Sequence, residues 1–185
     1  MSELEQILAD ISSSEATQAE RRKWNPLNQG EIDIRIAADG SWFHEGRRFK
    51  RSAMVKLFAG ILRREDDAYF LVTPVEKLRI EVEDAPFVAG LVEQIDDDGA
   101  PAIVFTTNIG ERVIVDQAHP LRVEIDAQSQ QPRPYVQLRD GLEALISRRA
   151  FYDLLNLAYE KHRDGGVFLA VSSRGQEFEL GSIDD

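Results

Sequence analysis

Apolar residues recur at helical spacing where the chain begins. The positions that share one helical face are Leu4, Ile7, Leu8 and Ile11. This spacing predicts a short amphipathic helix, and Ser2 and Glu5 have the spacing of a capping box at its start. The polar segment that follows, "SSSEATQAERRKWNPLNQG", is interrupted by Pro26 and Gly30 and is therefore predicted to be a connecting arm.

The pattern changes to strict alternation at Ile32. The apolar positions Ile32, Ile34 and Ile36 alternate with Asp33 and Arg35. Alternation places side chains on opposite faces of a β-strand. Asp39-Gly40 follows, a strong two-residue hairpin signal, so residues 41–44 are predicted to return as a second strand.

A second helical stripe follows the basic loop "GRRFKR". It consists of Met54, Leu57, Phe58, Ile61 and Leu62. These positions fit the apolar face of a helix that packs on a sheet. Two strand-like segments, "YFLVT" and "LRIEVE", come next and are joined by Pro-Val-Glu-Lys.

The same order of elements recurs near the C-terminus. Asp140-Gly141 corresponds to Asp39-Gly40, and "VFLAV" and "QEFELG" are two further strand-like segments. A third helical stripe, offset by 97 residues from the stripe that begins at Met54, consists of Phe151, Leu154, Leu155, Ala158 and Tyr159. We interpret this recurrence as duplication of a hairpin, helix, hairpin unit, with chance similarity of pattern as the alternative.

Between the two copies lie only strand-like segments and turns. Residues typical of turns separate four strand-like segments: "FVAGLVEQI", "AIVFTT", "RVIVD" and "LRVEID". This order predicts a β-meander. The predicted fold class is α+β, with two related halves that are each an antiparallel curved sheet under one covering helix. The predicted domains are residues 1–84, with helix, hairpin, helix and strands, and residues 85–185, with the meander followed by hairpin, helix and hairpin.

Composition indicates a folded, soluble chain. It has 185 residues, 43% of them hydrophobic and 30% charged, which is typical of a globular protein. It has no cysteine, which excludes disulfides and zinc–thiolate sites. No apolar run approaches the roughly 20 residues that span a bilayer, and the acidic N-terminus does not resemble a secretory signal. We therefore expect a cytoplasmic protein without membrane association.

The charge is negative overall but unevenly distributed. The net charge of −11 argues against general nucleic-acid binding, which needs a positive field. Residues 21–64 nevertheless hold eleven Lys and Arg against four Asp and Glu, a net of +7. This basic stretch either faces an anionic ligand or complements the acidic remainder of the molecule.

Familiar catalytic and metal-binding motifs do not occur in the sequence. It has no nucleophile elbow, phosphate-binding loop, dinucleotide fingerprint or His-Glu-x-x-His motif, and His44, His119 and His162 lack a second metal ligand at suitable spacing. We predict no catalytic residues, no metal and no cofactor. An enzyme acting on phosphorylated compounds would lack an evident nucleophile or base.

Unusual polar and aromatic residues gather around two loops of the N-terminal half. The predicted ligand-binding residues are Trp24, Asn25, Arg35, Thr73, Glu76, Lys77 and Asp84. The two basic groups would bind an anion, Trp24 would stack, Asn25 and Thr73 would orient the ligand, and the carboxylates would contact hydroxyls or support the cations. The alternative is a structural interface between the halves, held by ion pairs of the same residues.

Two long segments carry a family resemblance: "KWNPLNQGEIDIRIAADGSWFHEGRRFKRSAMVKLFAGILRRE" and the later "YFLVTPVEKLRIEVEDAPFVA". They resemble an uncharacterised bacterial group, domain-of-unknown-function family 1285. The looser C-terminal resemblance includes "VSSRGQEFELG", with Ser172 where the family pattern often has Trp. The resemblance implies a duplicated two-domain core, a C-terminal half superficially like the pleckstrin-homology fold, and a small-ligand or nucleotide site at the domain interface with a signalling role. That site would include the predicted residues.

Our leading hypothesis is a regulatory binding protein in signal transduction that takes a small anionic, nucleotide-based ligand at the interface of its halves. The alternative is a protein–protein interaction module without a small ligand, which presents a sheet edge or the basic surface to a partner protein.

Overall fold

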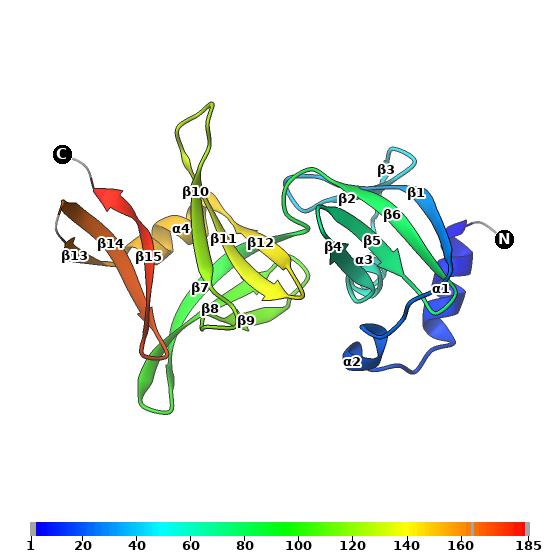
Figure 1. Ribbon diagram of the computed structural model, residues 1–185, viewed down its shortest axis with the longest axis horizontal. Helices are drawn as coiled ribbons and strands as arrows, with labels where there is room; N and C mark the ends of the chain where they lie inside the picture. Colours follow the sequence, from blue (N-terminus) through cyan, green and yellow to red (C-terminus); the bar gives the residue numbers. More distant parts are fainter. Residues whose placement is uncertain (1–2, 164, 184–185) are drawn as a thin grey trace. The chain divides into compact units, whose positions relative to one another are not determined.

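The computed structural model of the protein describes residues 3–163 and 165–183. The chain forms two compact units, Met1–Asp84 and Ala85–Asp185, which we call the N-terminal and C-terminal domains. Both are built mainly from curved β-sheets with few helices (Figure 1). None of the helices in the described part of the chain is long and apolar enough to cross a membrane.

The N-terminal domain begins with the predicted helix, α1 (Glu3–Ser12), which buries Ile7 and Ile11. The expected cap at Ser2 lies outside the described residues. The arm, predicted to be a loop, contains a short helix, α2 (Gln18–Arg21). Thr17 and Glu20 cap it reciprocally: Thr17 Oγ1 accepts from the Glu20 backbone N–H at 3.3 Å, and the Glu20 carboxylate accepts from the Thr17 N–H at 2.7 Å. The Thr-x-x-Glu spacing is the signal for this helix in the sequence.

One six-stranded sheet forms the centre of the N-terminal domain, in the order β3-β2-β1-β6-β5-β4. Its strands are β1 (Asn28–Ile36), β2 (Trp42–His44), β3 (Arg47–Arg48), β4 (Leu62–Glu65), β5 (Ala68–Val72) and β6 (Glu76–Val82). The prediction of a purely antiparallel sheet is wrong, because β1 and β6 pair in parallel. Parallel neighbours need a long crossover, and the chain between β1 and β6 supplies one that includes α3 (Ser52–Ala59).

An aromatic cluster packs α3 against the sheet. The ring centroids of Phe58 lie 6.4 Å from Trp42 and 5.7 Å from Phe49. The helix is shorter than predicted: it ends at Ala59, and Gly60 caps it through its backbone N–H. Ile61 and Leu62, predicted to lie on the helix, are buried beyond its end, and Leu62 opens β4.

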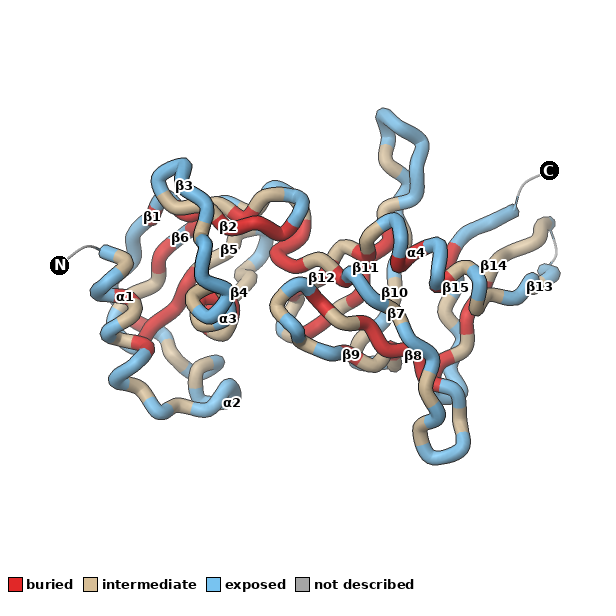
Figure 2. The backbone as a smooth tube through the Cα atoms, turned by 180° about the vertical axis from the view of Figure 1, so that it is seen from behind, coloured by how far each residue is buried: buried red, intermediate tan, exposed pale blue. Residues whose placement is uncertain are grey.

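The C-terminal domain contains a second six-stranded sheet and a separate three-stranded sheet. The large sheet has the order β10-β11-β12-β7-β8-β9, from β7 (Phe87–Asp97), β8 (Ala100–Thr107), β9 (Arg112–Ile114), β10 (Leu121–Ile125), β11 (Pro132–Arg139) and β12 (Leu142–Ile146). It too is mixed, since β12 and β7 are parallel. After α4 (Arg148–Leu155), the small sheet comprises β13 (Tyr159–Arg163), β14 (Gly166–Ser173) and β15 (Gln176–Ile183). Buried residues follow the strands of each domain (Figure 2).

The two domains differ in the place taken by the strands after the helix. After α3, the strands β4, β5 and β6 join the sheet that contains β1. After α4, the strands form a sheet of their own and do not return to β11. The helix α4 also ends at Leu155, so Ala158 and Tyr159 do not extend its apolar stripe. This arrangement does not confirm the internal duplication.

Candidate functional site

The seven predicted ligand-binding residues all belong to the N-terminal domain, but the structure divides them between two ends of the β1–β6 pair. The register pairs Asn28 with Glu76 at one end and Arg35 with Glu81 at the other. One group therefore lies near the start of these strands: Trp24, Asn25, Thr73, Glu76 and Lys77. Arg35 and Asp84 lie roughly 20 Å away, since a strand rises about 3.3 Å per residue.

The Arg35 guanidinium is engaged within its own domain. It forms an ion pair with Glu83 and lies 4.6 Å from the centroid of the Phe43 ring. The Ala38 backbone N–H donates to Glu83 at 2.9 Å, and this bond and the Arg35 partner lower the pKa of the Glu83 carboxyl. An anionic ligand at Arg35 would have to compete with that carboxylate.

The Lys77 ammonium is engaged in the same way. Its Nζ lies 2.7 Å from Glu65 Oε2 and 4.9 Å from the centroid of the Phe70 ring, and the side chain is only 12% exposed. Its hydrogen bond is the main reason that the pKa of Glu65 is lowered, and Arg63 adds to the effect from 3.6 Å. The predicted cation therefore belongs to a cluster in which it already forms an ion pair with the Glu65 carboxylate.

Thr73 holds the turn between β5 and β6. Its side chain is 1% exposed, and its hydroxyl accepts hydrogen bonds from the backbone N–H groups of Val75 at 3.2 Å and Glu76 at 3.1 Å. The hydroxyl also donates to the Glu76 carbonyl at 3.3 Å. Its hydrogen-bonding capacity is used by the turn that begins β6.

Glu76 lies among other carboxylates. Burial raises the pKa of its carboxyl, and repulsion from Asp10 and Glu3 on α1 raises it further. One carboxylate oxygen of Asp10 accepts from the Gln6 amide at 3.1 Å, while the other is buried with no hydrogen-bond partner among the described residues. The packing of α1 against the start of β6 therefore concentrates negative charge.

The remaining predicted residues border these groups. Trp24 is half-buried and its backbone carbonyl accepts from Arg63 at 2.9 Å, whereas Asn25 is exposed. Asp84 is half-buried just beyond the end of β6.

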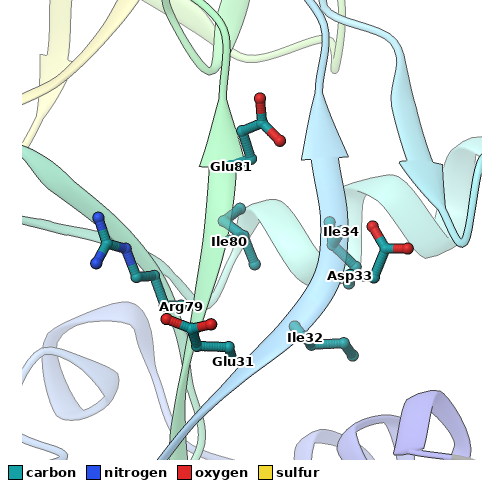
Figure 3. Close-up of a pocket in the computed structure, with 7 residues that line it drawn as sticks. All are labelled: Glu31, Ile32, Asp33, Ile34, Arg79, Ile80 and Glu81. Carbon is teal, nitrogen blue, oxygen red and sulfur yellow. The ribbon is translucent and has the colours of Figure 1, made fainter.

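A pocket of about 420 Å³ opens midway along the β1–β6 pair (Figure 3). The register shifts there, so residues 32–34 of β1 lie opposite residue 80 of β6 and the strands separate. The lining residues are Glu31, Ile32, Asp33, Ile34, Arg79, Ile80 and Glu81. Figure 3 shows the side chains of Arg79 and Asp33 projecting to opposite sides of the pair. Sequence reasoning missed this pocket because a register shift between distant strands has no local signal.

The charges of this pocket do not suit an anion. Its lining carries three carboxylates and one guanidinium. The described residues contain no group of three or more His, Cys, Asp or Glu side chains that could hold a metal ion. The pocket size is within the range of small-molecule sites, but its charge favours a cationic or hydroxyl-rich ligand.

A second feature is a set of exposed cations, which we call the basic edge: Arg47, Arg48, Lys50, Arg51 and Lys56. It runs from the edge strand β3 to the last turn of α3. None of the five forms an ion pair with another residue that the structure describes. Hydrogen bonds from Ser41 lower the pKa of Asp39, and the charge of Arg48 adds a smaller effect. Among the residues that the structure describes, these cations therefore lack a carboxylate at ion-pair distance.

Two family models match the chain. "Domain of unknown function (DUF1285), N-terminal domain" matches residues 21–85, and "Protein of unknown function (DUF1285), C-terminal domain" matches residues 86–180. No curated protein matches.

Two solved structures are similar to the chain. A DUF1285 family protein from Silicibacter pomeroyi DSS-3 is 42% identical, with a TM-score of 0.83, over 96% of this chain and 95% of that one. A DUF1285 family protein from Shewanella baltica OS155 is 31% identical, with a TM-score of 0.53, over 66% of this chain and 90% of that one.

Proposed function

The chain belongs to the DUF1285 family, whose two matched domains are described as of unknown function, and from that premise we propose that it is a protein–protein interaction module. In this proposal the N-terminal domain binds an acidic segment of a partner protein through the basic edge. The observation that supports it is the run of five exposed cations between positions 47 and 56 that lack an ion-pair partner among the described residues.

The layout of the basic edge fits an extended partner better than a small molecule. The five cations are spread over a strand, a loop and a helix, and β3 has a neighbouring strand on one side only. An extended acidic segment would pair with the cations that share one face of this edge, each exposed pair contributing about 0.2–1 kcal/mol. Such binding is moderate in strength and weakens strongly with salt. The net charge of −11 disfavours nucleic acid as the partner.

A second proposal keeps the small anionic, nucleotide-based ligand that the sequence led us to expect, with a role in signal transduction. Its support is the family resemblance, together with the half-buried Trp24 ring and the exposed Asn25 amide. The engagement of Arg35 and Lys77 with carboxylates weighs against it. We further propose that the two domains arose by internal duplication, that the C-terminal domain is superficially like the pleckstrin-homology fold, and that the protein is cytoplasmic.

The test is anisotropy with a fluorescent peptide of alternating Glu and Ser, compared with its Gln and Ser counterpart. The variant pair R47Q/R48Q removes two cations of the basic edge, and R112Q/R149Q removes two exposed cations from the C-terminal domain as a charge-matched control. We expect a threefold to tenfold loss of affinity, roughly 0.7–1.4 kcal/mol, for the first pair only. Raising salt from about 50 to about 300 mM should abolish most of the difference.

Equal losses in both pairs would contradict the interaction proposal, as would tighter binding of a single-stranded oligonucleotide of equal charge. The nucleotide proposal has its own measurement, a thermal shift against a nucleotide panel. Stabilisation that persists in R47Q/R48Q would support it, and no shift with any nucleotide would count against it.

A further inference from the structure

The C-terminal domain contains a pocket of about 500 Å³ between β11, β12 and α4. Its lining is mainly apolar, with polar groups from one loop, one strand and the first residue of α4. The lining residues are Gln131, Pro132, Arg133, Pro134, Leu145, Ile146, Arg148, Phe151, Tyr152 and Leu155. The size is that of a small-molecule site.

The sequence produces this pocket by ending one strand before its neighbour. The pairing of β11 with β12 reaches Tyr135 opposite Leu145, and the chain then turns at Ser147, whose hydroxyl accepts from the Ala150 backbone N–H at 3.2 Å to begin α4. The first residues of β11 extend past that point. Pro132 and Pro134 lie in this extension, where β11 pairs with β10 but no longer with β12. Neither has a backbone N–H, so neither presents a hydrogen-bond donor at this edge.

The floor of the pocket is apolar and well packed, and its mouth is accessible. Ile146 is 2% exposed and Phe151 is 8% exposed, while Tyr152 is 60% exposed. Leu145 and Leu155 are half-buried. An apolar ligand body would find both a preformed surface and an entrance.

Arg148 places an uncompensated positive charge on this pocket. Its guanidinium donates to the neutral Gln131 side-chain oxygen at 2.9 Å, and it forms no ion pair within the described ranges 3–163 and 165–183. The other guanidinium, that of Arg133, lies 3.7 Å from the Asp126 carboxylate and donates to the Tyr135 hydroxyl at 3.2 Å. Among the described residues that line the pocket, none carries a carboxylate.

We propose that this pocket binds a small amphipathic monocarboxylate, with its alkyl or aryl body against Pro134, Ile146 and Phe151 and its carboxylate at Arg148. The charge selects an anionic head group because a guanidinium pairs with a carboxylate in a bidentate, charge-assisted manner. The apolar wall selects against nucleotides and sugar phosphates. The proposal concerns the C-terminal domain and does not depend on the basic edge.

The experiment uses the full chain with octanoate as the probe and 1-octanol as its uncharged analogue. Calorimetry measures affinity, and amide and ring chemical shifts locate the site in the wild-type protein. R148Q removes the proposed head-group contact, and R149Q, one residue further along α4 with an 87% exposed side chain, is the matched control. We expect octanoate to bind saturably with shifts at Ile146, Phe151 and Tyr152. R148Q should weaken octanoate about tenfold and leave 1-octanol unchanged, and R149Q should change neither.

Each other outcome overturns the proposal. Absence of saturable octanoate binding, or shifts confined to other residues, would exclude the site. An equal effect of R148Q and R149Q would show that only net charge matters. A peptide ending in a free Leu carboxylate that binds more tightly than octanoate, while its amidated form does not bind, would identify the occupant as a protein C-terminus. Circular dichroism of each variant confirms that α4 is intact.

Discussion

The guanidinium of Arg63 on β4 donates a 2.9 Å hydrogen bond to the backbone carbonyl of Trp24, 39 residues earlier in the chain. Its second terminal nitrogen lies 3.0 Å from the carbonyl of Arg21 and 3.2 Å from that of Arg22. These carbonyls lie at and just beyond the end of α2, where a helix leaves acceptors without partners. One side chain therefore fixes the arm to the sheet.

The first prediction concerns this attachment. Arg63→Met keeps most of the aliphatic stem and removes the donors, so we expect faster amide exchange in residues 21–27 and a loss of about 1–3 kcal/mol in local stability. Hydrogen exchange followed by mass spectrometry of the arm peptide measures the effect. Arg64→Met is the control, because Arg64 contacts Asp66 and Asp67 in the adjacent turn. Unchanged exchange in the arm of Arg63→Met would show that the arm is held by other contacts.

The second prediction concerns a buried serine that joins the two sheets of the C-terminal domain. Ser173 is fully buried, and its Oγ donates to the Val115 carbonyl at 2.6 Å and accepts from the Ile103 backbone N–H at 2.9 Å. Ser173→Ala leaves both partners unsatisfied in the core, so we expect a loss of about 1–3 kcal/mol. Urea unfolding followed by circular dichroism measures it.

The neighbouring residue provides the comparison. Ser172 is half-buried, and Ser172→Ala should cost less than about 0.5 kcal/mol. Both tryptophans, Trp24 and Trp42, belong to the N-terminal domain, so the fluorescence transition should stay in place in both variants. Equal effects of the two alanine substitutions would mean that the bridge between the sheets contributes nothing.

The third prediction is a pH dependence of opposite sign at two glutamates. Burial and the nearby Asp10 and Glu3 raise the pKa of Glu76 above its ordinary value of 4.5, so the native state holds its proton more tightly than the unfolded chain. The resulting penalty appears as pH rises through the raised pKa and is fully present at neutral pH. Glu76→Gln should therefore raise the unfolding midpoint near pH 7 and flatten its decline with pH.

Glu65 should behave in the opposite way. The hydrogen bond from Lys77 lowers its pKa below 4.5, so its stabilisation is present above that value and is lost as pH falls through the lowered pKa. Glu65→Gln should lower the fluorescence midpoint near pH 7 and have little effect in strong acid. If both glutamine variants shift the midpoint in the same direction, the electrostatic assignment is wrong.

Local patterns predicted the elements whose signals are local. The alternation at Ile32, Ile34 and Ile36 identified β1 and its buried face, and Asp39-Gly40 identified the hairpin to β2. Helical periodicity alone overextended α3, since Ile61 fits the period but lies beyond the Gly60 cap.

Features that depend on distant parts of the chain were not predictable in this way. The parallel neighbour of β1 is β6, and the alternation of apolar residues in β1 does not indicate which strand pairs with it. The same limit applies to the candidate site. Arg35 and Lys77 were recognised as unusual cations, but their partners Glu83 and Glu65 lie 48 and 12 residues away. Sequence spacing between strands does not reveal which carboxylate reaches which cation, because the register decides it.

The last prediction separates a structural role of Thr73 from the ligand-binding role expected from the sequence. Thr73→Val keeps the shape of the side chain but removes the acceptor for the Val75 and Glu76 backbone N–H groups, which lie at 3.2 and 3.1 Å. Because the site is 1% exposed, water does not replace that acceptor, and the N-terminal domain should lose about 1–3 kcal/mol in urea unfolding followed by fluorescence. Thr73→Ser retains the hydroxyl and should recover most of the loss. A valine variant with unchanged stability would show that the turn does not need this hydroxyl, and would return Thr73 to the set of residues available to a ligand.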